Sequence, residues 1–214
     1  MSKIKARIKV QFPMVLLTLI SIIQALALEL LWGKVVASDY LFGGGIAAVV
    51  SWGMVTVCFL GIIQIWVLYS TMVMGVIWQP LIRDSVFPFI IGVQEFLMVS
   101  LVDAQFNPLW LFVLASIFIS ANWMSHNSLR RARQDPDNAQ FFNNIEPARL
   151  KDFIPLIGIV AALTLMGILG LLTNNQNWLP LLAIVLTNLI LLLQILASRR
   201  LWRRVLALPG EEEN

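Results

Sequence analysis

The sequence predicts an all-α, polytopic integral membrane protein: a bundle of six transmembrane helices with both termini in the cytoplasm. Apolar residues make up 59% of the 214 residues and charged residues 13%, whereas soluble proteins average about 45–50% and about 25%. The apolar residues form six long runs, each sufficient for a helix to cross a hydrocarbon core of about 30 Å. Lys and Arg are concentrated in alternate connections, which predicts the orientation.

The six runs extend over about 11–32, 46–74, 85–102, 108–125, 153–172 and 177–198. Helices are expected because backbone polar groups in lipid need partners within their own segment. Transmembrane β-strands alternate apolar and polar residues, and runs such as LIGIVAALTLMGILGLL do not. The first run follows a Lys-rich start and contains Ala25-Leu26-Ala27, which are features of a signal peptide. Its apolar character continues to Trp32, so we expect it to be the first span.

The basic residues predict the orientation of the spans. With six spans, fourteen of the fifteen Lys and Arg residues lie on one side, and Lys34 alone lies on the other. Because positive charge accumulates on the cytoplasmic side, both termini are expected there, in a plasma membrane or bacterial inner membrane. The formal charge of +3 is therefore a topology signal, and nucleic-acid binding is not expected.

The chain is predicted to be a single transmembrane domain over residues 1–214, with two polar segments. A cytoplasmic loop covers 126–152, which is too short for an independent domain, and a tail that is first basic and then acidic covers 199–214. Arg83 and Asp84 are expected to form a local ion pair or to contact headgroups. Anionic lipid headgroups attract basic clusters near a membrane. The arginines expected to contact lipid or a partner are Arg130, Arg131, Arg133, Arg199, Arg200, Arg203 and Arg204.

Polar residues at membrane depth are the main functional candidates, because ionisable groups there are costly and mark pathways or partners. Glu95 lies near the middle of the third run, beside Gln94. Burial favours a neutral carboxyl, which could relay a proton or simply bond a neighbouring helix. The residues expected along a polar pathway are Glu95, Gln94, Glu29, Gln24, Gln64 and Asn188. The same amides, together with Asn122 and Gln194, also suit interhelical hydrogen bonds, and Glu29 also suits the outer interface.

Composition argues against several kinds of chemistry. His126 is the only histidine and Cys58 the only cysteine, which excludes a bis-His haem within the chain, an internal disulfide and a cysteine-cluster metal site. The sequence contains no GxSxG, HExxH, P-loop or GxGxxG motif. We therefore expect no catalytic residues, cofactor or metal, and no enzymatic activity.

Two functions fit these features. The first is a small channel or transporter, homo-oligomeric because one small chain encloses little wet volume, with a polar intramembrane route around Glu95. The second is a non-catalytic membrane subunit, assembly factor or sensor. In that case the polar residues would bind partner helices and the 126–152 loop would dock a cytoplasmic protein.

Overall fold

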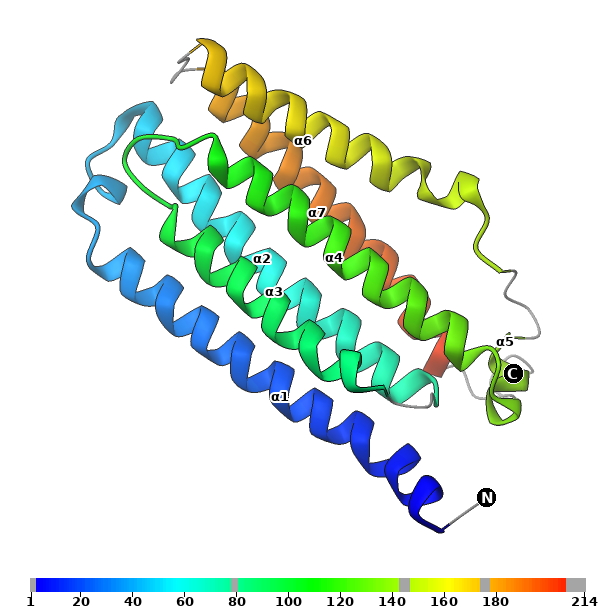
Figure 1. Ribbon diagram of the computed structural model, residues 1–214. Helices are drawn as coiled ribbons and strands as arrows, with labels where there is room; N and C mark the ends of the chain where they lie inside the picture. The colour runs from blue at the N-terminus through cyan, green and yellow to red at the C-terminus, as the bar shows by residue number, and fades with distance from the viewer. Residues whose placement is uncertain (1–2, 78–80, 143–146, 174–177, 207–214) are drawn as a thin grey trace, which may run out of the picture.

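The computed structural model describes residues 3–77, 81–142, 147–173 and 178–206, and this part of the chain is almost entirely helical and contains no strand (Figure 1). The long helices are α1 (Lys3–Val36), α2 (Gly45–Gly75), α3 (Ile82–Ser100), α4 (Leu109–Ala132), α6 (Ile154–Thr173) and α7 (Trp178–Leu206). The short elements are η1 (Asp39–Leu41), η2 (Pro136–Asn138), α5 (Ala139–Phe142) and η3 (Leu150–Phe153). The predicted all-α class is confirmed.

Five of these helices are long and apolar enough to cross a membrane, which supports a multi-pass membrane protein. The segments are Gln11–Val36, Gly45–Gly75, Leu109–Ala132, Leu150–Thr173 and Trp178–Leu196. Helix α3 coincides with the predicted third span but is not among them. It has 19 residues and contains Arg83, Asp84 and Glu95. Six spans and the cytoplasmic position of the termini therefore remain predictions.

The outer surface of the bundle is apolar. Leu172 is 78% exposed, Trp32 68% and Ile154 64%, and large aliphatic side chains are exposed along most of α6 and α7. A soluble protein rarely leaves so continuous an apolar surface in contact with water. Against lipid chains the same surface carries no such penalty, so this pattern supports a bundle surrounded by hydrocarbon.

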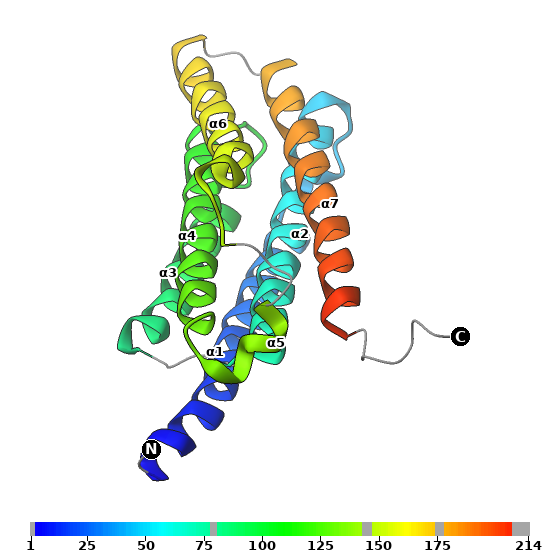
Figure 2. The same cartoon turned by 90° about the vertical axis from the view of Figure 1, so that its right-hand side faces the viewer.

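The helices pack in a defined order. Helix α1 contacts α2 and α3, α3 contacts α4, α4 contacts α6, and α2 contacts α7. Figure 2 shows α4 and α6 together on one side of the bundle and α2 and α7 together on the other. The start of α3, the end of α4 and the end of α7 lie at the same end of the bundle as the start of α1 (Figure 1). The long helices thus run alternately up and down.

Glycines allow the closest approaches between these helices. A Cβ at Gly53 of α2 would lie 2.1 Å from Ile184 Cγ2 of α7, and one at Gly92 of α3 would lie 2.5 Å from Ile23 Cγ2 of α1. Small residues are common at such contacts because helix association in lipid depends on van der Waals packing. These two glycines therefore hold α7 against α2 and α1 against α3.

A buried ion pair joins α3 to α4 near the start of α3. Arg131 donates from Nη1 to Asp84 Oδ2 at 2.8 Å and from Nη2 to Asp84 Oδ1 at 2.5 Å. The side chains are 16% and 5% exposed, respectively. Asp84 also accepts from the backbone N–H of Leu81 and so caps α3. From the sequence, Asp84 was expected to pair with Arg83 or to contact headgroups. In the structure Asp84 pairs with Arg131, and the side chain of Arg83 lies outside the described part of the chain.

Asn138 fastens the segment after α4 to the end of α2. Its Oδ1 accepts from the backbone N–H of Ile77 at 2.9 Å. Its Nδ2 donates to the carbonyls of Ile77 and Ala132, and the residue is 4% exposed. One amide therefore satisfies three backbone groups where two helices end. The start of the 126–152 segment is consequently fixed against the bundle.

Candidate functional site

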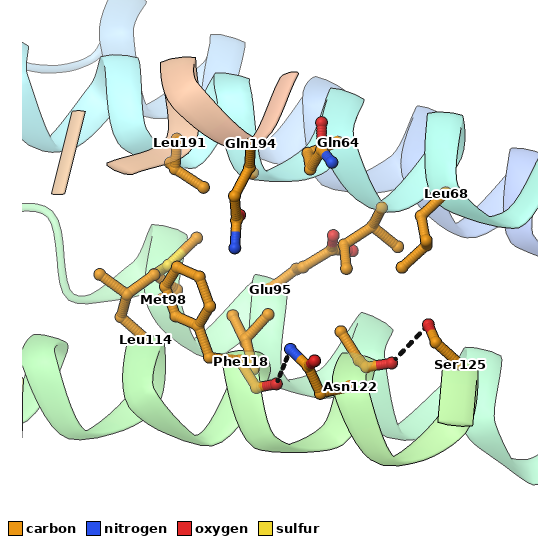
Figure 3. Close-up of a pocket in the computed structure, with 14 residues that line it drawn as sticks. Gln64, Leu68, Glu95, Met98, Leu114, Phe118, Asn122, Ser125, Leu191 and Gln194 are labelled. Carbon is orange, nitrogen blue, oxygen red and sulfur yellow. Dashed lines mark hydrogen bonds between the residues drawn. The ribbon is translucent and has the colours of Figure 1, made fainter. Parts of the chain in front are cut away.

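A cavity of about 300 Å³ lies among four helices near the middle of the bundle (Figure 3). Its polar lining residues are Gln64 of α2, Glu95 of α3, Asn122 and Ser125 of α4, and Gln194 of α7. Its main apolar lining residues are Ile65, Leu68, Met98, Leu114, Ile117, Phe118 and Leu191. Small-molecule sites range over about 300–1,000 Å³ and are mostly apolar with a few polar groups. This cavity has both properties.

Glu95 is the acidic group of the cavity wall and is 1% exposed. Its Oε2 accepts from Nε2 of Gln24 on α1 at 2.9 Å. Its Oε1 has no hydrogen-bond partner among the described residues. A buried polar atom without a partner costs free energy, so a proton on this oxygen, or a donor brought against it, would stabilise the site.

The two polar residues of α4 present acceptors to the cavity. Asn122 donates its Nδ2 to the carbonyl of Phe118 at 3.1 Å. Ser125 donates its hydroxyl to the carbonyl of Ala121 at 2.8 Å. With one N–H of Asn122 and the hydroxyl of Ser125 bonded within their own helix, Asn122 keeps its Oδ1 and its second N–H, and Ser125 keeps the lone pairs of its Oγ. Figure 3 shows both bonds along α4 and the amide of Gln194 reaching toward the same space from α7.

The cavity wall carries an acid and, among its lining residues, no Lys, Arg or His. An isolated carboxylate in a low-dielectric environment is expensive unless a positive charge compensates it. That charge is a proton on the carboxyl group or a cation beside it. The described residues contain no cluster of three or more His, Cys, Asp or Glu side chains that could hold a metal.

The residues of the predicted polar pathway do not form a single route. Gln64 lines the cavity and Gln24 bonds Glu95, so these two residues lie at the same site as Glu95. Gln94 instead donates to the hydroxyl groups of two α4 serines, each at 3.0 Å. Asn188 donates to backbone carbonyls of α7 and of Gly53 in α2, and Glu29 is exposed on α1. None of these last three residues lines the cavity.

Asn122, Ser125 and Gln194 were not among the predicted pathway residues, although they line the cavity. The sequence did contain a signal for the α4 pair. The lining residues of α4 are Leu114, Ile117, Phe118, Ala121, Asn122 and Ser125. These residues are alternately three and one positions apart in the chain, which places them on one face of the helix. This face becomes more polar toward the C-terminal end of α4. That this face meets Glu95 depends on the packing.

Several arginines predicted to contact lipid or a partner have other roles in the structure. Arg131 binds Asp84, and the guanidinium of Arg133 lies 4.5 Å from the ring centroid of Phe142. Arg130 is exposed and remains suited to a headgroup or partner contact. The side chains of Arg199, Arg200, Arg203 and Arg204 and the tail 207–214 lie outside the described residues.

The fold and the composition support one class, a helical multi-pass membrane protein, and the bundle contains a mostly apolar cavity with one acid and three amides in its wall. Comparison with protein-family models, with curated proteins and with solved structures gave no match.

Proposed function

We propose that the protein is a small membrane transport protein that carries a cation through the cavity at Glu95. The observation that carries this proposal is a 1% exposed glutamate in the wall of a cavity of about 300 Å³, whose Oε1 has no hydrogen-bond partner in the part of the chain that the structure describes. Buried acids are a recurring device of proton and cation pathways. The amides around Glu95 supply polar contacts that a dehydrated cation requires.

Six spans are part of the proposal, with α3 as the third. Helix α3 lies alongside α1 and α4 (Figure 1) and contacts both. Two of its charged groups have partners inside the bundle: Asp84 binds Arg131 and Glu95 binds Gln24. Charged residues that have partners and face the interior of a bundle are compatible with a helix that crosses the membrane. The concentration of basic residues at the end where α1 starts supports cytoplasmic termini.

The cavity is built from one chain, with four helices contributing to its wall. Transport by alternating exposure of this cavity therefore does not require a second copy. Homo-oligomerisation remains a prediction about assembly and is not needed for the route.

The experiment compares wild type with Glu95→Gln in proteoliposomes. Gradients of protons, sodium, potassium, ammonium and 2-phenylethylammonium are imposed in turn, and flux is followed by an entrapped pH dye and by solid-supported membrane currents. Glu29→Gln is the matched control because it makes the same change of acid to amide at an exposed position outside the cavity. We expect flux in wild type and in Glu29→Gln, and at least about a tenfold loss in Glu95→Gln, since the group that compensates the cation's charge is removed.

Absence of flux for every cation with folded, monodisperse wild-type protein would refute the transport proposal. Equal flux in wild type and Glu95→Gln would also refute the role of the cavity. If Glu95→Gln instead abolished co-purification of a partner chain and left flux unchanged, the alternative of a membrane subunit, assembly factor or sensor would replace the proposal.

A further inference from the structure

We infer that the cavity at Glu95 binds a small primary ammonium compound with an apolar body. This inference rests on the cavity of the proposed function and specifies its substrate class. It follows from three features of the cavity wall: its available hydrogen-bond acceptors, its charge and its apolar lining.

On the α3 and α4 walls acceptors outnumber donors, while Gln64 of α2 and Gln194 of α7 each bring an amide with both donors and an acceptor. Glu95 Oε1 has no partner within the described structure. Asn122 and Ser125 have bonded a donor each to the α4 backbone, which leaves acceptor oxygens. Carboxylate and hydroxyl oxygens suit a ligand that brings several N–H groups. A primary ammonium group has three donors and no acceptor, so it is the complementary group.

The charge of the wall favours a cation over an anion. Among the lining residues Glu95 is acidic and none is basic. A carboxylate on the ligand would lie near Glu95 without a compensating charge, which is costly against a mostly apolar wall. An ammonium group beside Glu95 would instead form a charge-assisted hydrogen bond, the stronger kind.

The remaining wall favours an organic ligand over a bare inorganic ion. Leu68, Met98, Leu114, Phe118 and Leu191 belong to the lining, and none can replace the hydration shell of a metal ion. At about 300 Å³ the cavity also far exceeds the volume of one ion, while it falls within the range of small-molecule sites. An apolar body attached to the ammonium group would fill this space and displace water from apolar side chains.

The test measures binding of 2-phenylethylammonium to the full-length protein in phosphatidylcholine nanodiscs by isothermal titration calorimetry. Three probes vary one property each: 2-phenylethanol removes the charge, 3-phenylpropanoate reverses it, and methylammonium removes the apolar body. Empty nanodiscs correct for partition into lipid. We expect 2-phenylethylammonium to bind at least about tenfold more tightly than each of the other three. The alcohol and the carboxylate lose the charge-assisted hydrogen bond, and methylammonium loses the burial of the apolar body.

Variants locate the site. Glu95→Gln should abolish the preference for the amine over the alcohol, whereas Glu29→Gln, outside the cavity, should retain it. Unchanged 2-phenylethanol binding in Glu95→Gln would show that the cavity remains folded. Nanodiscs containing phosphatidylethanolamine distinguish the source of the ammonium group, because weaker apparent binding there would identify a lipid amine as the occupant.

Equal affinity for the amine and the alcohol in wild type would overturn the inference, as would an amine preference that survives Glu95→Gln. These results differ from failure of the proposed function. Flux of inorganic cations without selective amine binding would overturn the substrate class alone. Selective amine binding without any flux would overturn transport and leave the binding site.

Discussion

Removing the guanidinium of Arg131 is expected to destabilise the bundle strongly, because the change leaves Asp84 buried without its partner. Arg131→Met keeps much of the apolar stem of the side chain and deletes its charge. The two donor–acceptor distances of 2.8 and 2.5 Å describe a bidentate pair, and the Asp84 side chain is only 5% exposed. This pair is therefore a buried one and not a screened surface contact.

The magnitude follows from the hydrogen bonds that are lost. A hydrogen bond to a charged group contributes about 1.5–3 kcal/mol, so two of them suggest about 3–6 kcal/mol. Removing one member of a buried ion pair typically costs about 3–5 kcal/mol. Asp84 retains the N–H of Leu81 as a partner, which reduces its penalty. We therefore expect Arg131→Met to lower the free energy of unfolding by about 3 kcal/mol.

The assay is reversible unfolding in mixed micelles with increasing sodium dodecyl sulfate, followed by circular dichroism. Arg130→Met is the matched control, because Arg130 is the neighbouring residue on α4 and is exposed. Its loss should change the free energy of unfolding by less than about 0.5 kcal/mol. Asp84→Asn and the double variant complete a cycle, in which a coupling of about 1–3 kcal/mol is expected for residues in contact.

Equal, small effects of Arg131→Met and Arg130→Met would refute this reasoning. A coupling energy near zero would also refute it, even if each single variant were destabilising, because the two side chains would then contribute independently.

Two further predictions concern packing and the connection after α4. Gly53→Ala should lower the free energy of unfolding by about 1–3 kcal/mol, because the new Cβ would lie 2.1 Å from Ile184 Cγ2. Gly158→Ala is the control, since a Cβ there meets open space. It should be neutral or slightly stabilising in the same unfolding assay. Asn138→Ala removes three hydrogen bonds and should cost about 3 kcal/mol, with faster hydrogen exchange at the amide of Ile77 as the direct readout. Unchanged exchange at that amide, or equal effects of the two glycine substitutions, would contradict these predictions.

The site was only partly predictable from the sequence. Glu95 stands out because one acidic residue in a long apolar run requires a partner, and that requirement can be read without coordinates. Its partner cannot be identified in this way: Gln24 lies 71 residues earlier in the chain. Gln94 and Asn188 are equally polar and equally deep in their runs, yet they bond α4 serines and α2 backbone outside the cavity. Which amide faces the cavity depends on the rotation of each helix about its own axis.

The amino-acid sequence by itself determined the helical class and the positions of the long helices. Hydropathy and the need for backbone hydrogen bonds in lipid act on each segment locally, so runs of apolar residues suffice. The tertiary structure decided which helices lie side by side, that Asp84 pairs with Arg131, and that four helices contribute to the wall of a cavity at Glu95. Helix association in lipid depends on close packing at small residues such as Gly53 and Gly92. Such contacts join segments far apart in the chain, so they become visible only when the helices are placed together.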